Sequence, residues 1–356
     1  MSLIMYLKSI ILYKSKIKLK QALSIKNQVF RYRESIICKF INTNNKIVCS
    51  EISFLRNLNQ DTLFSSYLEF LRIQKFILKI NWDWEQLLGE SPYLSSISNR
   101  NLFPSLHFCI EIAIYKFLTK NISNQVNSSI KMPINRLLTK IEENSTISNS
   151  LNTHTLKLKI GHLAVQDALK FVQFILSNKL PFTNLRLDIN AQWSFEKFLA
   201  FIQYFDTTTF EYIEEPVCSL KSLEWLSQYC NHPIALDESL KAFSLSQILF
   251  LKAIQAIILK PSSIGSLREI INLVNLAFKR GIMPIFTGVF ESDIGIINVL
   301  YLIYHLDIFL PVGFDTYNWI QEVDLFFQKE LYCKRDNLYI CFANNLNFKV
   351  KKLQRI

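Results

Sequence analysis

The stretch Leu156-Lys-Leu-Lys-Ile-Gly161 decides the predicted fold, because its charged and apolar residues alternate strictly. A period of two is that of a β-strand, so Lys157 and Lys159 share one face and the apolar side chains share the other. A second stretch, Leu185-Arg-Leu-Asp-Ile-Asn190, repeats this pattern. The two stretches therefore predict neighbouring strands of one sheet, each with an apolar face and a face that carries charge.

Short apolar segments continue from there to the end of the chain, separated by amphipathic helical patterns. Successive strands are 23 to 29 residues apart, close to the roughly 30 residues of one unit in a (β/α)₈ barrel. A doubly wound sheet has similar spacing, but it usually carries a glycine-rich first turn, and none is present. We therefore expect an α/β fold, a TIM-type barrel of seven or eight units. The expected strands are Ile134–Leu138, Leu156–Ile160, Leu185–Ile189, Glu211–Glu215, Ile234–Asp237, Ala256–Lys260, Met283–Thr287 and Val312–Asp315.

The first third of the chain has a different pattern. Residues 35–40 alternate as a strand does, whereas Asp61–Phe76 and Ser105–Leu118 have helical periodicity. This mixture predicts an α+β domain. The expected organisation is an α+β domain over residues 1–120, a connection over 121–133, the barrel over 134–325 and a C-terminal segment over 326–356.

Composition excludes several classes of protein. With 50% hydrophobic and 19% charged residues, only 7 glycines and 9 prolines, the chain is too apolar for disorder and unsuited to a fibrous structure. The net charge of +11 would suit a nucleic-acid partner. However, the basic residues are spread along the chain and lysine is favoured by AT-rich codons, so we expect a solvated surface and no nucleic acid. Seven cysteines without a CxxC pair indicate free thiols in a reducing compartment.

No membrane span is expected. The start of the chain, Met1–Lys20, is interrupted by lysines and lacks the pattern of a targeting peptide. The longest apolar stretch, near Val299–Val312, is broken by His305 and Asp307 and is too short to cross a bilayer. The protein is expected to stay in the compartment where it is made, as a monomer or a homo-oligomer, two alternatives between which the sequence does not decide.

Charged residues fall at the carboxyl ends of five successive expected strands. They are Lys159, Asp188, Glu214, Asp237 and Lys260. Carboxyl ends of barrel strands meet at one face, and carboxylates from three strands suit a hard divalent cation such as Mg²⁺. A buried lysine needs a carboxylate partner or a catalytic use. The pattern therefore predicts a metal site flanked by lysines.

Each of these residues also has a simpler interpretation. An acid before a helix is often an N-cap, and Lys157 with Lys159 could belong to a half-exposed strand. The order of base, three acids and base at consecutive strand ends favours a functional site over these separate explanations.

The motifs resemble those of the enolase superfamily, muconate-lactonizing subgroup, and within it the o-succinylbenzoate synthases. Besides the two opening stretches, the resemblance rests on Tyr212-Ile-Glu-Glu-Pro216, Ala235-Leu-Asp-Glu-Ser239, Ile258-Leu-Lys-Pro261 and Phe290-Glu-Ser-Asp-Ile-Gly295. Cys49-Ser-Glu-Ile-Ser53 is similar to the Gly-x-Gly-Glu-Ile-Ser motif of the family's capping domain, with both glycines replaced. The resemblance covers nearly the whole chain.

The resemblance implies a two-domain enzyme in which the α+β domain caps the barrel and the C-terminal tail packs on that cap. Lys159 would be the general base and acid, Lys260 the cation that stabilises the intermediate, and Lys157 an auxiliary group. Asn190 and Glu238 would orient the ligands. The metal positions for Mg²⁺, with Mn²⁺ as a substitute, would be Asp188, Glu214 and Asp237. Weaker candidates for substrate binding are Arg186, Gly288, Val289, Glu291 and Ser292.

The implied reaction is a dehydration by a hydro-lyase that acts on a small carboxylate. In it, 2-succinyl-6-hydroxy-2,4-cyclohexadiene-1-carboxylate loses water in a syn sense, through a metal-stabilised enediolate, to give 2-succinylbenzoate for menaquinone or phylloquinone. The alternatives are an N-succinylamino acid racemase or dipeptide epimerase, with Lys159 and Lys260 as two bases, and a barrel without catalytic activity. The quinone pathway and AT-rich composition suggest the plastid stroma of an alga, with a plastid-encoded protein, or a bacterial cytoplasm.

Overall fold

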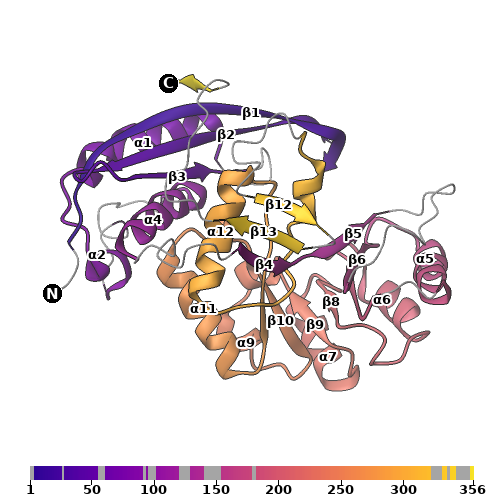
Figure 1. The fold of residues 1–356 in the computed structure, drawn as a ribbon. Helices are drawn as coiled ribbons and strands as arrows, with labels where there is room; N and C mark the ends of the chain where they lie inside the picture. Colours follow the sequence, from indigo (N-terminus) through magenta and orange to yellow (C-terminus); the bar gives the residue numbers. More distant parts are fainter. Residues whose placement is uncertain are drawn as a thin grey trace.

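An antiparallel sheet and a parallel sheet with its surrounding helices form the two main parts of the protein, seen here in a computed structural model (Figure 1). The antiparallel sheet lies across one side of the molecule, and the parallel strands lie beneath it. The structure describes residues 4–25, 28–54, 61–90, 94, 102–119, 129–139, 154–178, 182–321, 331–334, 337–341 and 353–356.

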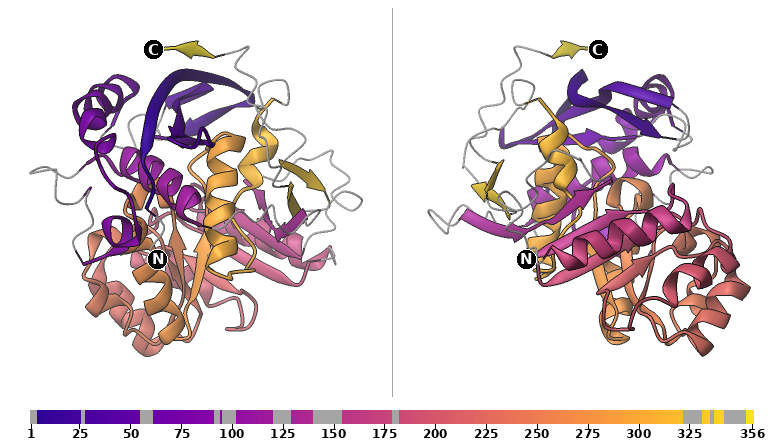
Figure 2. Two further views of the ribbon diagram at one scale, coloured as in Figure 1. Left: turned by 60° about the vertical axis from the view of Figure 1, so that its left-hand side comes forward. Right: turned by 90° about the vertical axis from the view of Figure 1, so that its right-hand side faces the viewer.

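The N-terminal part is a four-stranded sheet with helices on one face. Its strand order is β14-β1-β2-β3, with β1 and β2 paired as a long antiparallel hairpin. Helix α4 packs against both β3 and the barrel helix α10, so it lies between the two parts (Figure 2). The described elements are β1 (Leu7–Ile25), β2 (Gln28–Asn42), β3 (Ile47–Ile52), α1 (Leu63–Ile77), α2 (Trp84–Leu88), α4 (Pro104–Leu118) and, from the C-terminus, β14 (Gln354–Arg355). Both helices predicted in this part are confirmed.

The second part is a seven-stranded parallel sheet in the order β11-β10-β9-β8-β7-β6-β5. The strands are β5 (Asn135–Leu138), β6 (Thr155–Lys159), β7 (Asn184–Asp188), β8 (Tyr212–Glu214), β9 (Ile234–Leu236), β10 (Ile254–Leu259) and β11 (Met283–Phe286). The helices are α5 (Val165–Ser177), α6 (Phe195–Ile202), α7 (Leu220–Tyr229), α8 (Ser239–Ala242), α9 (Leu245–Ile248), α10 (Pro261–Ile264), α11 (Leu267–Lys279) and α12 (Asp293–His305). The predicted alternation of strands and helices is confirmed.

Strands β8 to β11 send alternate residues to two separate apolar clusters. Side chains such as Leu156, Leu158 and Leu187 are fully buried in the large cluster that includes the helices. A second, smaller cluster fills the space inside the curled sheet with Tyr212, Ala235, Ala256, Ile258 and Ile285. The polar face predicted for the opening stretch therefore points inward, where the interior of a barrel is packed with side chains.

The sheet closes without a regular eighth strand. Only Val312 and Gly313 form bridges, to Ile134 and Thr287, and the backbone N–H of Gly313 donates to Phe286 O at 2.8 Å. The predicted strand Val312–Asp315 is therefore wrong beyond its first two residues. The reason lies in Asp315, whose carboxylate accepts from Leu137 N at 2.9 Å and begins the 3₁₀ helix η3 (Asp315–Trp319) instead.

The segment predicted as a connection, 121–133, ends in a strand. That strand, β4 (Ser129–Pro133), pairs with β13 (Asn337–Cys341), and β13 pairs with β12 (Leu331–Lys334). The rest of the predicted connection lies outside the described residues. In the described part of the C-terminal segment, β14 pairs with the N-terminal sheet, through Tyr13 and Lys14 of β1.

The sequence predicts free thiols and no membrane-spanning helix. The six cysteines for which the structure describes the side chain are free thiols, three of them buried. In the described parts of the chain, no helix has both the length and the apolar character that crossing a bilayer requires.

A lysine connects the two parts at the contact of α4 with α12. Lys116 donates to Asn298 Oδ1 at 2.8 Å and lies 5.5 Å from the ring centre of Tyr301. Burial lowers the pKa of Lys116 to about 8, because the ammonium form loses its hydration.

We expect this lysine to make stability rise with pH. Between pH 8 and 10.5 the folded state binds fewer protons than the unfolded state, so unfolding becomes less favourable as pH rises. Urea unfolding of the wild type and of Lys116→Met at pH 7.5 and pH 10 measures the effect. The wild type should gain about 2 kcal/mol relative to the variant. A difference between the two proteins that does not depend on pH would contradict the assignment.

Candidate active site

Strand register brings three of the predicted site residues to one level of the barrel. Lys159 is the register partner of Asp188, which in turn is the partner of Glu214. All three close their strands at the carboxyl end, and Asp237 and Lys260 directly follow β9 and β10. The alternation that sends Leu158 and Leu187 outward sends these side chains inward. The structure thus gathers the predicted acids and lysines on one face of the barrel.

Lys157 joins two of the acids from one level below. Its Nζ lies 3.0 Å from Asp188 Oδ2 and 2.6 Å from Glu214 Oε2. Only 12% of its side chain is exposed. Burial alone would lower the pKa of Lys157, but the charges of Asp188 and Glu214 outweigh it and raise the pKa. Lys157 is therefore an ammonium group that contacts both Asp188 and Glu214.

Lys260 has the same relation to the third acid. Its Nζ donates to Asp237 Oδ2. Burial would lower the pKa of Lys260, yet the negative charges of Asp237 and Glu214 raise it. The strands β6 and β10 are four positions apart in the sheet, so Lys260 lies across the barrel from Lys159 as an ion-paired ammonium group.

Lys159 is held more loosely than the other two lysines. Its Nζ lies 3.6 Å from Asp188 Oδ2 and donates to Asn190 Oδ1 at 3.4 Å, both long contacts. Its side chain is 39% exposed. Asn190 has a positive φ of 51°, and its backbone N–H donates to Asp188 Oδ1. Of the site's three lysines, Lys159 is therefore the one best able to reach a molecule above the barrel.

The pKa values of two of the acids are shifted in opposite directions. Burial, followed by the charge of Asp188, raises the pKa of Glu214 to about 8. For Asp188 burial acts in the same direction, but Lys157 and Lys159 outweigh it and lower the pKa to about 2. The pKa of Glu214 is raised beyond the effect of burial because the neighbouring carboxylate of Asp188 disfavours a second negative charge. An added cation would relieve this repulsion.

Asp188, Glu214 and Asp237 have the donor chemistry that Mg²⁺ needs, oxygen atoms from three adjacent strands. As the side chains stand, no three Asp, Glu, His or Cys groups among the described residues converge on a point where an ion could sit. The carboxylate oxygens that would bind it face the ammonium groups of Lys157 and Lys260 instead. The residues fit the ion in kind and in charge, and binding it requires these ammonium groups to give way.

We expect Mg²⁺ binding to release a proton near neutral pH. With a pKa of about 8, Glu214 is largely protonated at pH 7 in the absence of a metal, and a carboxylate ligand must be deprotonated. Titration calorimetry at pH 7 in buffers of different ionisation enthalpy counts the protons released. Close to one proton per Mg²⁺ is expected at pH 7 and almost none at pH 9; equal release at both pH values would contradict this.

Glu215 is a residue whose importance the sequence interpretation missed. It is fully buried, has a positive φ of 45°, and its carboxylate accepts from Asp237 N at 2.6 Å and from Ser239 N at 2.8 Å. A residue keeps such an unfavourable backbone conformation only where surrounding contacts stabilise it. Glu215 thus fixes the backbone of the third acid, whereas Glu238, predicted for that role, is exposed at the start of α8. The only signal was the doubled acid in Glu214-Glu215-Pro216.

Arg186 is not brought to the site. It is fully buried one level below Asp188, where its Nε donates to Glu211 Oε2 at 2.5 Å and its Nη1 donates to Pro311 O at 3.0 Å. Glu211 and Pro311 lie towards the amino ends of the strands. Arg186 therefore binds groups inside the barrel and does not reach the face of the candidate site, contrary to the prediction.

Of the substrate-binding residues predicted after β11, one is partly exposed and three are buried. Gly288 is partly exposed at the end of the strand. Val289 is buried, and its backbone N–H donates to Glu291 Oε2 at 2.6 Å. Glu291 and Ser292 are also buried, with hydrogen bonds to other parts of the chain. The side chains of Glu291 and Ser292 therefore shape this turn and do not face a substrate, contrary to the prediction.

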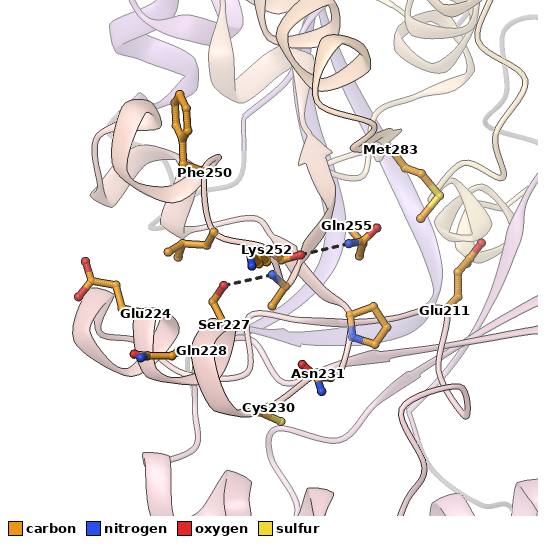
Figure 3. A pocket seen from close by; sticks show the side chains of 13 residues that line it. Glu211, Glu224, Ser227, Gln228, Cys230, Asn231, Phe250, Lys252, Gln255 and Met283 are labelled. Carbon is orange, nitrogen blue, oxygen red and sulfur yellow. Dashed lines mark hydrogen bonds between the residues drawn. The ribbon is translucent and has the colours of Figure 1, made fainter.

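A pocket of about 800 Å³ lies at the other end of the barrel (Figure 3). Glu211, Pro233 and Ala253 line it, and each directly precedes a strand, β8, β9 or β10. Active sites of such barrels lie at the carboxyl ends of the strands. The pocket in Figure 3 is thus separate from the candidate site.

Fold and site together define a class, the capped (β/α)-barrel proteins that carry acids and lysines at the carboxyl ends of their strands. Residues 147–329, about half of the chain, match the enolase C-terminal domain-like family. The chain belongs to this family, and the predicted enolase-superfamily fold is confirmed.

Curated relatives share part of the chain. The o-succinylbenzoate synthase of Yersinia pestis (strain Pestoides F) is 29% identical over 169 residues, which are 46% of this chain and 51% of that protein. The chloroplastic protein PHYLLO of Arabidopsis thaliana is 26% identical over 189 residues, 47% of this chain and 11% of that protein. The match thus spans about half the length of the bacterial relative and a small part of the plant relative.

Solved structures share the fold over nearly the whole chain. The L-Ala-D/L-Glu epimerase of Bacillus subtilis has a TM-score of 0.78 at 16% identity, over 97% of this chain and 99% of that one. The muconate lactonizing enzyme of Pseudomonas fluorescens has a TM-score of 0.76 at 16% identity, over 97% and 96% of the two chains. Likeness at this identity extends to the fold alone.

Proposed function

We propose that the protein is an o-succinylbenzoate synthase that dehydrates 2-succinyl-6-hydroxy-2,4-cyclohexadiene-1-carboxylate to 2-succinylbenzoate with Mg²⁺. The unequal pairing of the two lysines across the barrel carries the proposal. Lys260 is ion-paired with Asp237, whereas Lys159 makes only long contacts and is partly exposed. One accessible base facing a fixed cation suits a reaction in which one group removes and returns a single proton. The identity with the Yersinia synthase supports the same reaction.

In the proposed reaction, Lys159 in its neutral form takes the proton from the carbon next to the ring carboxylate. The ammonium group then gives this proton to the neighbouring hydroxyl on the same face, so water leaves and the ring becomes aromatic. Lys260 remains an ammonium group and faces the developing negative charge. Bound Mg²⁺, held by Asp188, Glu214 and Asp237, would supply further positive charge at the substrate carboxylate.

An epimerase or racemase of the same superfamily is the second candidate. Several solved structures with this fold are dipeptide epimerases, and one from Cytophaga hutchinsonii is complexed with Mg and a dipeptide. Such a reaction with two lysine bases needs a neutral group on each side of the substrate. In the structure as it stands, Lys260 is an ammonium group paired with Asp237 and not a neutral base, which favours the dehydratase over this candidate.

An assay of the purified protein with Mg²⁺ separates these functions. We expect the absorbance of the cyclohexadiene to disappear, while N-succinylamino acids and dipeptides keep their configuration and take up no deuterium from ²H₂O. Racemisation without loss of the cyclohexadiene would reject the proposal. For the cellular location we propose a plastid stroma or a bacterial cytoplasm, in keeping with the chloroplastic and bacterial relatives.

A further inference from the structure

The turn that follows β11 has a strained backbone held by the N-terminal sheet. Phe290 has a φ of 65°, a left-handed conformation that is unfavourable for a bulky side chain. Its carbonyl oxygen accepts a hydrogen bond from Arg33 Nε at 3.1 Å. Arg33 belongs to β2, so a residue of the N-terminal domain secures the least favourable position of this turn.

The arginine itself is fixed by further contacts. It is buried, its Nη2 donates to Ser53 Oγ at 2.7 Å, and its Nη1 donates to Glu34 O at 2.8 Å. The planar guanidinium thus binds three groups in set directions, which a lysine cannot reproduce. The contacts with Ser53 and Glu34 therefore fix the orientation of Arg33 independently of its contact with Phe290.

A second residue of the N-terminal domain holds the other end of the turn. Glu51 Oε2 accepts from Ser292 N at 2.9 Å and from Ser292 Oγ at 2.7 Å, at the first turn of α12. A carboxylate is favoured there by the helix dipole. A Cβ atom on Gly295 would come within 2.5 Å of Glu51 Oε2, so the glycine makes room for this contact.

The barrel supplies its own support to the same turn. Glu291 accepts from Ser262 Oγ at 2.7 Å and from Val289 N at 2.6 Å. The turn is therefore held from the barrel by Glu291 and from the N-terminal domain by Arg33 and Glu51. Gly288 begins this turn at the carboxyl end of β11, on the face where the candidate site lies.

We propose that Arg33 and Glu51 are positioning residues that set the shape of the Gly288–Ser292 turn and thereby determine which substrate side chain the site accepts. The inference rests on the proposed function, because it takes the succinyl side chain as the part of the substrate that meets the turn. Lys159 and Lys260 lie at the ends of other strands, β6 and β10, so Arg33 and Glu51 are expected to affect binding and selectivity more than the chemical step.

Arg33→Lys and Glu51→Gln test the proposal, with Arg31→Lys, an exposed residue of the same strand, as the matched control. We expect KM for the cyclohexadiene substrate to rise about tenfold in both variants, with kcat changed less than about threefold. The preference for a succinyl over a glutaryl side chain should fall about tenfold. The control should match the wild type.

Amide hydrogen exchange tests the turn without relying on activity. In Glu51→Gln the Ser292 amide should exchange about tenfold faster, because a neutral acceptor replaces a charged one. The Val289 amide, bonded to Glu291, should keep its rate. If both variants lose only thermal stability, with KM, selectivity and Ser292 exchange unchanged, the proposal is overturned. If the wild type lacks dehydratase activity, the proposed function fails, and faster exchange at Ser292 alone still supports the positioning role.

Discussion

Replacing Lys159 with alanine is expected to reduce kcat for the dehydration by about 10³-fold to 10⁴-fold, at the upper end of what a general base contributes. The variant should fold, because the side chain is 39% exposed and makes only long contacts to Asp188 and Asn190. The rate is measured from the loss of cyclohexadiene absorbance at saturating Mg²⁺.

Lys170→Ala is the matched control for this prediction. It makes the same substitution at an exposed position on α5, the helix that follows Lys159, and should retain the wild-type rate. A complementation test in a strain that lacks the synthase gives an independent measurement. If Lys159→Ala restored quinone synthesis as well as the wild type does, the protein would not act through this lysine.

Replacing Glu214 with glutamine is expected to weaken Mg²⁺ binding by at least about 100-fold and to lower kcat/KM by a similar factor. The change keeps the shape of the side chain but removes the ability to become a carboxylate ligand on β8, the strand between those of Asp188 and Asp237. A lost charge at a metal position removes both affinity and the stabilisation of developing charge. Calorimetry measures the affinity, and the release of a proton at pH 7 should disappear with it.

Glu224→Gln, on the exposed face of α7, provides the control for Glu214. It should bind Mg²⁺ as the wild type does. Unaltered Mg²⁺ affinity in Glu214→Gln would show that the ion does not bind at the three strand ends.

The strand pattern of the barrel could be predicted from the sequence because it depends on local periodicity. Lys157 and Lys159 alternate with leucines, and the structure turns them inward as period two requires. The same logic predicted Asp188 and Glu214 at the carboxyl ends of successive strands, and the register pairs them at one level. Predictions that rest on spacing and alternation needed no knowledge of distant parts of the chain.

The partners of polar side chains could not be predicted in this way. Ser292 is hydrogen-bonded to Glu51, a residue 241 positions away in the sequence. Arg186 forms a salt bridge with Glu211 inside the barrel. Whether a polar residue faces a substrate or a distant partner depends on packing that no local pattern records. For the same reason Glu215 was passed over, since its role depends on hydrogen bonds to the next strand end.

The most direct test of the proposed reaction is ¹H NMR of the purified protein with the cyclohexadiene substrate and Mg²⁺, run beside Lys159→Ala and a sample treated with a chelator. The account predicts aromatic resonances of 2-succinylbenzoate with the wild type and Mg²⁺, and only the slow uncatalysed conversion in the other two samples. Equal rates in all three samples would contradict it.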